Sequence, residues 1–405
     1  MVVLAILVIT AGCAAYQYFK GTLVTAFATI VNAVFASFIA FGFFELTASF
    51  LAKYLAAIAD WAQLICFAML FLIPFAVFQT AIPQALRHKV DLGLWPERIG
   101  RSVCGVVLGY IVSGLLLTAA AMAPLPNAYP YQRFDQRNPD SDRPDRVALN
   151  ADGFTTGLFS LASNGSFRAI SNRRSFAALH PAFLDQLFLN RHSISDVPVM
   201  TSEPAIEVPA KAGSWYAGES VRDSEGKPLS PRPGHSLIMV RIGIKRSSLS
   251  DAGKFTLSQL RVVCRPKNDK NTLAGKGRNV YPIGYLTAPN QLQPRKLNEK
   301  IEVQGVTETV KWIDFAFYVP VDFIPVVAEF KLNNIADVPA PVSAEQAPAQ
   351  EFFGESAQPQ QPSTQPQEPN QPTKPRNPEE RKRSPRRGGL SNVSKGVVGD
   401  QLGEN

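Results

Sequence analysis

Four long runs of apolar residues occupy the first third of the chain, separated by short polar segments. They cover residues 2–18, 22–44, 61–83 and 103–123, and none contains Lys, Arg, Asp or Glu. An α-helix needs about 20 residues to cross the hydrocarbon core of a bilayer. These runs also lack the polar face of a helix on the surface of a soluble protein. The pattern therefore predicts a domain of four transmembrane helices over residues 1–123, in contact with the lipid bilayer.

Residues 124–194 predict a linker with amphipathic helical segments. The stretch 124–146 is rich in Pro, Asn, Asp and Arg, which is typical of irregular structure. Two apolar stripes at helical spacing follow, formed by Phe154, Leu158, Phe159 and Leu161, and by Phe183, Leu184, Leu187 and Phe188. We expect both stripes to pack against the following domain. The alternative is a position on the membrane surface, where anionic lipids would bind Arg168, Arg173, Arg174 and Arg191.

Short strands dominate the pattern between residues 195 and 338. The expected strands cover residues 236–245, 257–264, 279–286, 300–303, 310–319 and 326–332. Pro282 limits its strand to a sheet edge or to a strand start, because proline lacks the N–H of the ladder. Short strands separated by Gly, Pro, Asn and Asp turns predict an all-β, sandwich-like domain.

Residues 339–405 are of low complexity and rich in Pro and Gln, which predicts a disordered tail. The tail contains a basic cluster formed by Arg381, Lys382, Arg383, Arg386 and Arg387. A solvated tail without a fixed partner is one interpretation of this cluster. Electrostatic contact with anionic lipids or with an acidic cell-wall polymer is the other.

The charge of the short loops predicts the orientation in the membrane, because cytoplasmic loops carry the excess of Lys and Arg. The basic residues that set the topology are Lys20, Arg87, Lys89, Arg98 and Arg101. Placing them inside the cell puts the N-terminus and the β-domain outside, so the C-terminal domain is expected to be extracytoplasmic. The first run has no basic segment before it and is interpreted as a retained helix rather than a signal peptide.

Small and polar residues in the apolar runs predict how the helices pack. Gly105 and Gly109 form a GxxxG pattern in the fourth run, and Gly100 lies three residues before that run. Such glycines let another backbone approach closely, within the bundle or across a homo-oligomer through the fourth helix. Asn32 lies near the middle of the second run and predicts an interhelical hydrogen bond, with a place in a solute path as the alternative.

Two motifs in the first third carry a resemblance to a known family. The first is a short apolar run followed by the basic turn Lys20-Gly21 and a long second run. The second is the segment PERIGRSVCGVVLG over residues 96–109, an acidic residue and an arginine before a glycine-spaced last helix, with one residue between Arg98 and Gly100. The region 1–123 resembles the colicin V production protein family. The resemblance implies a bacterial inner-membrane protein with a role in toxin production or export, or in envelope maintenance.

No motif for an active site, a cofactor or a metal rises above chance. The four histidines, His88, His180, His192 and His235, show no ligand spacing, and the four cysteines include no CxxC. The net charge of +8 is too modest to indicate nucleic-acid binding. We therefore expect a non-enzymatic envelope scaffold or accessory protein, whose β-domain binds an envelope protein or a cell-wall partner. The alternative is an oligomeric transporter or channel component.

Overall fold

The computed structural model describes residues 1–20, 22–85, 93–163, 175–191, 196–229, 232–268, 277–303 and 308–353. Several predicted features lie outside the described residues. These are Arg87 and Lys89, the basic cluster 381–387, His88 and His192, and three arginines of the linker, Arg168, Arg173 and Arg174.

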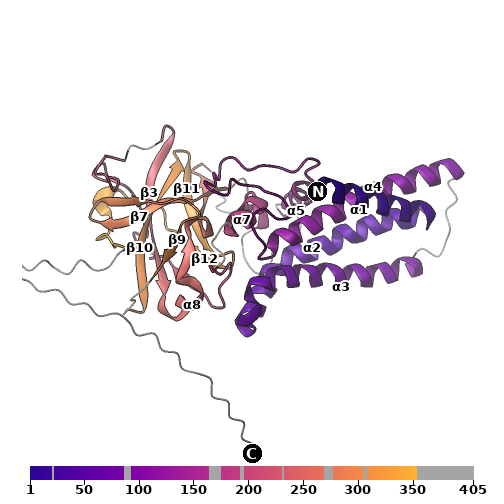
Figure 1. The fold of residues 1–405 in the computed structure, drawn as a ribbon, viewed down its shortest axis with the longest axis horizontal. Helices are drawn as coiled ribbons and strands as arrows, with labels where there is room; N and C mark the ends of the chain where they lie inside the picture. Colours follow the sequence, from indigo (N-terminus) through magenta and orange to yellow (C-terminus); the bar gives the residue numbers. More distant parts are fainter. Residues whose placement is uncertain are drawn as a thin grey trace, which may run out of the picture. The chain divides into compact units, whose positions relative to one another are not determined.

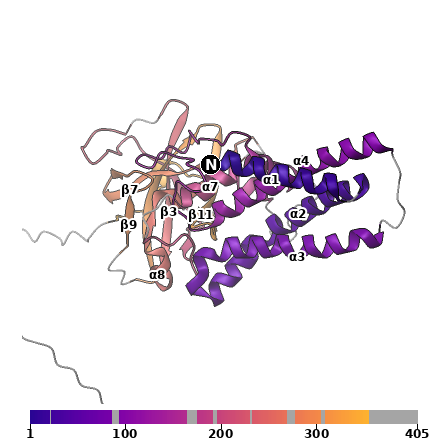
Figure 2. The ribbon, with the colours of Figure 1, turned by 45° about the vertical axis from the view of Figure 1, so that its right-hand side comes forward.

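Four long helices form the N-terminal part and lie side by side (Figures 1 and 2). They are α1 (Val2–Phe19), α2 (Leu23–Tyr54), α3 (Ala62–Ala85) and α4 (Leu94–Met122), with a 3-10 turn η1 (Ala56–Trp61) between α2 and α3. All four are long and apolar enough to span a membrane. Helix α1 packs on α4, α4 on α2, and α2 on α3. The prediction of four long apolar helices in the N-terminal part is confirmed.

Helices α2 and α4 extend beyond the apolar runs that predicted them. Helix α2 continues past residue 44 to Tyr54, and α4 begins at Leu94 rather than at residue 103. The added turns contain the charged residues Glu45, Lys53, Glu97, Arg98 and Arg101. Charge ends an apolar run without ending a helix, because Glu, Lys and Arg have high helix propensity.

The start of α2 is fixed by two side chains. The hydroxyl of Thr22 accepts a hydrogen bond from the backbone N–H of Thr25, and the Thr25 hydroxyl accepts one from the N–H of Thr22 at 2.7 Å. Glu97 in the first turn of α4 accepts the N–H of Leu23 at 2.8 Å. These bonds satisfy donors that an isolated helix leaves unpaired, and they tie α2 to α4.

Three short helices form a layer next to the transmembrane helices, here named the collar. They are α5 (Ala151–Ser163), α6 (Phe176–Leu179) and α7 (Phe183–Asn190). Phe41 of α2 stacks on Phe159 with ring centroids 4.8 Å apart, and Phe44 meets Phe183 at 5.9 Å. The region 124–194 therefore contributes a packed layer as well as a linker. It contacts the transmembrane helices, which the sequence did not indicate.

The two predicted apolar stripes are buried to different degrees. All four residues of the second stripe are buried in α7: Phe183, Leu184, Leu187 and Phe188. In α5, Phe159 is buried, whereas Phe154 and Leu161 are 46% and 75% exposed. Helix α7 begins at Phe183, because Pro181 is followed by Ala182 with a left-handed φ of 59°.

Twelve strands occur among the described residues of the C-terminal part. They are β1 (Ile206–Glu207), β2 (Ser214–Tyr216), β3 (His235–Lys245), β4 (Lys254–Thr256), β5 (Leu260–Pro266), β6 (Arg278–Val280), β7 (Pro282–Ala288), β8 (Gln291–Pro294), β9 (Lys300–Glu302), β10 (Val310–Pro320), β11 (Phe323–Phe330) and β12 (Asn334–Asp337). Four short helices lie among or after them: η2 (Arg246–Ser248), α8 (Leu249–Ala252), η3 (Leu257–Gln259) and η4 (Ala344–Gln346). Pro282 is the first residue of β7.

The strands build two antiparallel sheets that share one core. The larger sheet has the order β1-β3-β10-β7-β8 with β2 paired to β3, and the smaller has the order β12-β11-β5-β6. A separate pair joins β4 and β9. Val240 and Phe315 of the larger sheet share a buried cluster with Val262 and Phe330 of the smaller. The predicted all-β, sandwich-like domain is confirmed and is called the β-sandwich below.

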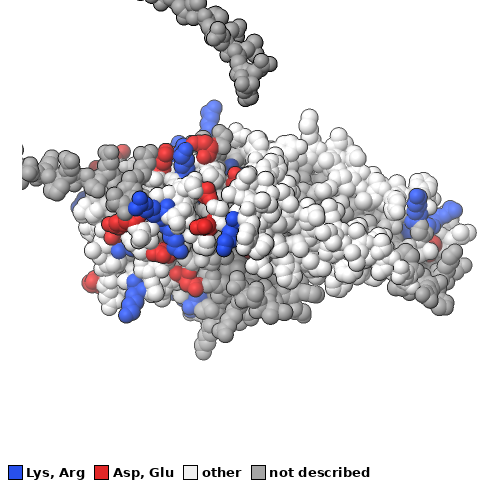
Figure 3. All heavy atoms as spheres, turned by 90° about the horizontal axis from the view of Figure 1, so that it is seen from below, with Lys and Arg blue, Asp and Glu red and all other residues white. Residues whose placement is uncertain are grey.

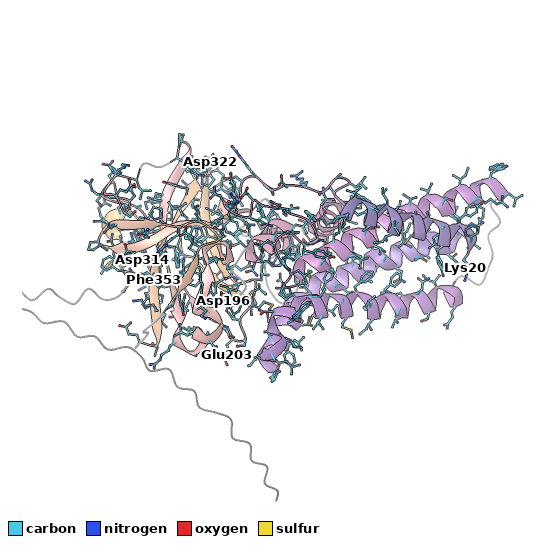
Figure 4. All side chains as sticks on the ribbon, viewed as in Figure 1. Lys20, Asp196, Glu203, Asp314, Asp322 and Phe353 are labelled. Atoms are coloured by element: carbon cyan, nitrogen blue, oxygen red, sulfur yellow. The ribbon has the colours of Figure 1, made fainter. Side chains whose placement is uncertain are left out.

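Residues 339–353 pack on the β-sandwich as a C-terminal strap, so the predicted start of a disordered tail at residue 339 was too early. Val342 pairs in parallel with Trp215, and the N–H of Phe353 donates to the carbonyl of Leu286 at 2.8 Å. The N–H of Glu351 donates to buried Asp314, which is also paired with Arg241 at 2.7 Å. Backbone bonds of this kind leave little trace in an Ala-, Pro- and Gln-rich sequence. Figure 4 marks Asp314 and Phe353.

Candidate functional site

The glycines predicted for packing lie against helix α1 of the same chain. A Cβ added to Gly105 would lie 2.5 Å from the Cα of Ala14, and one added to Gly109 would lie 2.5 Å from the Cα of Thr10. A Cβ at Gly100 would lie 2.7 Å from the side chain of Leu23. Because the first two neighbours are backbone atoms, a larger residue at either position requires α1 to move.

Asn32 joins α2 to α3. Its amide donates to the carbonyl of Phe75 at 3.0 Å and to the side-chain oxygen of Gln79 at 3.2 Å. Both partners lie on α3. The geometry corresponds to an interhelical hydrogen bond within one chain.

The described topology-setting residues lie at one end of the helices. Lys20 ends α1, and Arg98 and Arg101 lie in the first turns of α4. Figure 4 shows Lys20 at the end of the helices far from the β-sandwich. The face shown in Figure 3 carries no Lys, Arg, Asp or Glu between this charged end and the charged β-sandwich. An uncharged band between two charged ends fits a bilayer-spanning segment.

A buried network of polar side chains connects α2 to the β-sandwich through the collar; it is named the junction network. His180, 3% exposed, lies between Glu45 of α2 and Gln186 of α7. Its Nε2 is 2.7 Å from Glu45 Oε1, an ion-pair distance that is not aligned for a straight hydrogen bond. Its Nδ1 is 2.8 Å from Gln186 Oε1.

The β-sandwich side of the junction network is an ion pair. Arg261 of β5 donates to Glu329 of β11, and both side chains are almost completely buried. Gln186 donates to the same carboxylate, and Arg261 also bonds the carbonyl of Leu179 at 2.9 Å. The partners come from α2, the end of α6, α7, β5 and β11, so the network fixes the relative positions of α2, the collar and the smaller sheet.

Charge at the junction shifts the pKa of His180. Burial alone would lower it, but attraction to Glu45 and Glu329 outweighs burial and the repulsion from Arg261. The result is a pKa raised above the usual value of a histidine. A protonated imidazole at this position would offset the second carboxylate, because Arg261 carries a single positive charge.

Arg191, at the end of α7, ties the collar to the end of α4. Arg191 donates to the carbonyls of Ala120 and Ala123 at the end of α4, each at 3.2 Å, and its guanidinium lies 4.6 Å from the ring of Phe188. A cation at a helix C-terminus satisfies carbonyls that have no partner within the helix. Burial lowers the Arg191 pKa to about 10. Arg191 is thus a cap inside the fold and not a lipid-facing residue.

Beside the junction, a lysine is buried under the turn between β11 and β12. Lys331 has no exposed surface, and its Nζ donates to the carbonyls of Asp251 and Lys254. Burial lowers its pKa to about 7, against attraction from Asp60 and Asp251. Lys331 and Leu332 have left-handed φ angles of 48° and 61°. Because non-glycine residues rarely adopt this conformation, the hydrogen bonds of the Lys331 side chain must hold the turn in place.

A polar groove of about 830 Å³ opens on the β-sandwich between the linker and the strand ends. The linker loop 138–143 forms one wall. The other wall comes from β6 and β7, the chain after β8, and one end of β3 and β10. The basic residues of its lining are Arg143, Arg232, His235, Arg278, Arg295 and Lys296, and the acidic ones are Asp140, Asp142 and Glu299.

The charges of the groove are only partly compensated. Three loose ion pairs use all three carboxylates: Arg143–Asp140 at 3.8 Å, Arg278–Asp142 at 3.7 Å and Arg295–Glu299 at 3.3 Å. Arg232 lies over the ring of Tyr318 at 5.4 Å and, with Lys296, adds positive charge without a carboxylate within the described lining. Pro282, Pro294 and Pro320 give the walls rigid apolar surface.

The arrangement supplies charge and hydrogen bonds for binding. Among the residues that the structure describes, no group of three or more His, Cys, Asp and Glu could hold a metal. Cys264 is buried, and burial raises the pKa of its thiol, which opposes formation of the reactive thiolate. The basic residues of the groove lining supply a surface that attracts negative charge.

Sequence reasoning missed the junction network and the groove. Glu45 lies just outside the apolar run 22–44 and carries no motif, and His180 is one of four histidines without ligand spacing. One signal was available: a single carboxylate directly follows the apolar run ending at Phe44, and such a residue commonly has a buried partner. No signal identified the groove, because its walls come from segments far apart in the chain.

Comparison with known protein families, with characterised proteins and with solved structures finds no match to this chain.

Proposed function

We propose that this chain is a membrane-anchored accessory protein of the bacterial envelope, whose helices hold a ligand-binding β-sandwich on the outer side of the inner membrane. The polar groove carries the proposal, because it combines uncompensated positive charge with a rigid attachment to the helices through the junction network. A scaffold of this kind works by holding its ligand at a fixed position relative to the bilayer.

The ligand that fits the groove best is an acidic cell-wall polymer. Small-molecule sites are usually enclosed and mostly apolar, whereas this groove is polar and open at the surface. The carboxylates Asp140, Asp142 and Glu299 would repel a backbone with dense phosphates, which argues against nucleic acid. A polymer with separate acidic groups and many hydroxyls can bind the basic residues and avoid the carboxylates.

The resemblance of region 1–123 to the colicin V production family supports the inner-membrane location. It also motivates the more specific part of the proposal, a role in toxin production or export, or in envelope maintenance. The transporter alternative has less support. No Lys, Arg, Asp or Glu occurs in residues 23–43, 67–82 or 102–122, where a path for a charged solute would need one.

Binding is tested with the full-length protein in detergent and purified bacterial cell walls. Sedimentation with the walls should be strong at low salt and weak at high salt. Replacing Arg232→Gln together with Lys296→Gln should weaken it several-fold. The matched control, Lys211→Gln with Lys227→Gln, removes two exposed lysines outside the groove lining and should leave binding unchanged. Equal binding by both double variants would contradict the groove as the site.

Orientation is tested with a C-terminal tag in intact spheroplasts. Cleavage of the tag by added protease without lysis is expected if the β-sandwich lies outside. Protection until lysis would place it in the cytoplasm. Cytoplasmic partners, including nucleic acid for Arg381–Arg387, would then replace the cell wall.

A further inference from the structure

The end of the hairpin formed by α2 and α3 exposes large apolar side chains next to the β-sandwich. This hairpin tip consists of residues 46–61. Its exposed residues are Leu46 at 67%, Phe50 at 65%, Tyr54 at 65%, Leu55 at 51% and Trp61 at 43%. Monomeric soluble proteins rarely expose a contiguous apolar surface of this kind without a partner.

The opposite face of the hairpin tip is already occupied by the segment leading to the β-sandwich. Ala52, Ala59 and Ala62 pack with buried Met200. Asp60 accepts the backbone N–H of Val199 at 3.0 Å. The exposed face is therefore separate from the contact that joins the tip to the rest of the fold.

The length of α2 sets the depth of the tip. Helix α2 has 32 residues, which is about 48 Å at about 1.5 Å per residue. It begins level with Gly100 of α4. The hydrocarbon core is about 30 Å thick and the bilayer with headgroups about 40–45 Å. The core thus ends near Phe43, and the tip begins at the headgroup level on the side of the β-sandwich.

The exposed face continues the lipid-facing surface of α2. Large residues three or four positions apart run along it: Phe27, Val31, Phe35, Ile39, Phe43, Leu46, Phe50 and Tyr54, of which Ile39 is half-buried. From Phe27 to Tyr54 this stripe is about 40 Å long, close to the thickness of a bilayer with its headgroups. An uninterrupted apolar stripe of this length is expected where a helix lies in lipid along its whole length.

The chemistry of the tip is that of a membrane interface. Tyr54 and Trp61 are the aromatic residues that collect at the headgroup level, where the ring is apolar and its polar atom reaches water. Lys53 lies with its Nζ 5.9 Å from the ring of Tyr54. A lysine beside such a ring can extend to the lipid phosphates.

We propose that the hairpin tip binds lipid, with its exposed side chains in the headgroup region of the leaflet nearest the β-sandwich. The Met200 and Asp60 contacts on its other face then hold the β-sandwich against the bilayer surface. The tip is thus an interfacial anchor of the β-sandwich, independent of the ligand in the groove.

Spin-label accessibility in reconstituted full-length protein tests the proposal. Cys13, Cys66, Cys104 and Cys264 are first replaced by Ala, and single labels are placed by Phe50→Cys or Leu46→Cys. The vesicles contain phosphatidylcholine and phosphatidylglycerol, and relaxation is measured with oxygen, which partitions into lipid, and with a water-soluble nickel chelate. Phe35→Cys serves as the deep control, and Glu203→Cys as the exposed control on the β-sandwich side.

Both tip labels should show an oxygen-to-nickel ratio several-fold above that of the Glu203 label and below that of the Phe35 label. A ratio equal to that of Glu203 would place the tip in water and overturn the proposal. Protection from both reagents would mean that protein covers the tip, which also overturns it. Dilution of the protein in the vesicles would then show whether that protein is a second copy of this chain.

Discussion

Between α1 and α4 the closest contacts join backbone to backbone, with Gly105 and Gly109 against Ala14 and Thr10. Between α2 and the β-sandwich they join charged side chains, through Glu45 and the junction network. Lipid is as apolar as the helices, so helix association there depends on close packing and not on the hydrophobic effect. At the junction, buried charged side chains set the relative positions of α2, the collar and the β-sandwich. The two regions should therefore respond to different substitutions.

The largest effect is expected from the ion pair of the junction network. Arg261→Met leaves Glu329 charged and buried, which typically costs about 3–5 kcal/mol. Combining it with Glu329→Leu should recover most of the loss, since no unpaired charge then remains. The measurement is denaturant unfolding of the full-length protein in detergent. Arg278→Met is the matched control, because its ion pair with Asp142 is loose and half exposed. An equal loss of unfolding free energy in this control would show that burial of the Arg261–Glu329 pair is not the cause.

Replacing the glycines tests the other region. Gly105→Leu with Gly109→Leu should push α1 away from α4, and overpacking of this kind costs about 1–3 kcal/mol per site. Gly42→Leu is the control, because no atom lies within 4 Å of a Cβ added there. Resistance to unfolding by a denaturing detergent should fall for the double variant and not for the control. Unchanged resistance, with unchanged cross-linking between α1 and α4, would contradict close backbone packing.

The junction should also respond to pH, whereas the glycine contacts should not. His180 has a raised pKa in the folded protein, so its contribution is complete below its unfolded pKa of about 6.5. That contribution is lost as the pH rises through the raised folded pKa. The melting temperature of the parent protein should therefore fall across this window relative to His180→Gln. Parallel pH profiles for the two proteins would show that the imidazole is not charged at the junction.

The smallest effect is expected from the polar contact between α2 and α3. Asn32→Leu removes the hydrogen bonds to Phe75 and Gln79. Interhelical hydrogen bonds in membranes average about 0.6 kcal/mol, because the separated helices also find partners. A double-mutant cycle with Gln79→Leu measures the coupling free energy between the side chains of Asn32 and Gln79. A coupling as large as that of the Arg261–Glu329 pair would remove the distinction between the two regions.

Local pattern was sufficient to predict the helices and most of the long strands. Apolar runs located α1 to α4, and alternation located β3 and β10, because each signal depends on neighbours within one element. Helix ends were harder to predict, since Glu97 and Lys53 interrupt the apolar run and not the helix. The burial of Lys331 had no local signal at all, because the carbonyls of Asp251 and Lys254 that receive it come from another part of the chain.

The C-terminal strap gives the β-sandwich an order of assembly. Arg241 and Asp314 lie opposite each other in β3 and β10, and within the described residues the pair has its backbone partners at residues 349 and 351. These residues are synthesised after every strand of both sheets. A nascent chain can therefore form the sheets before it can complete this buried pair. A chain that ends before residue 349 would leave the buried Arg241–Asp314 pair without these two hydrogen bonds.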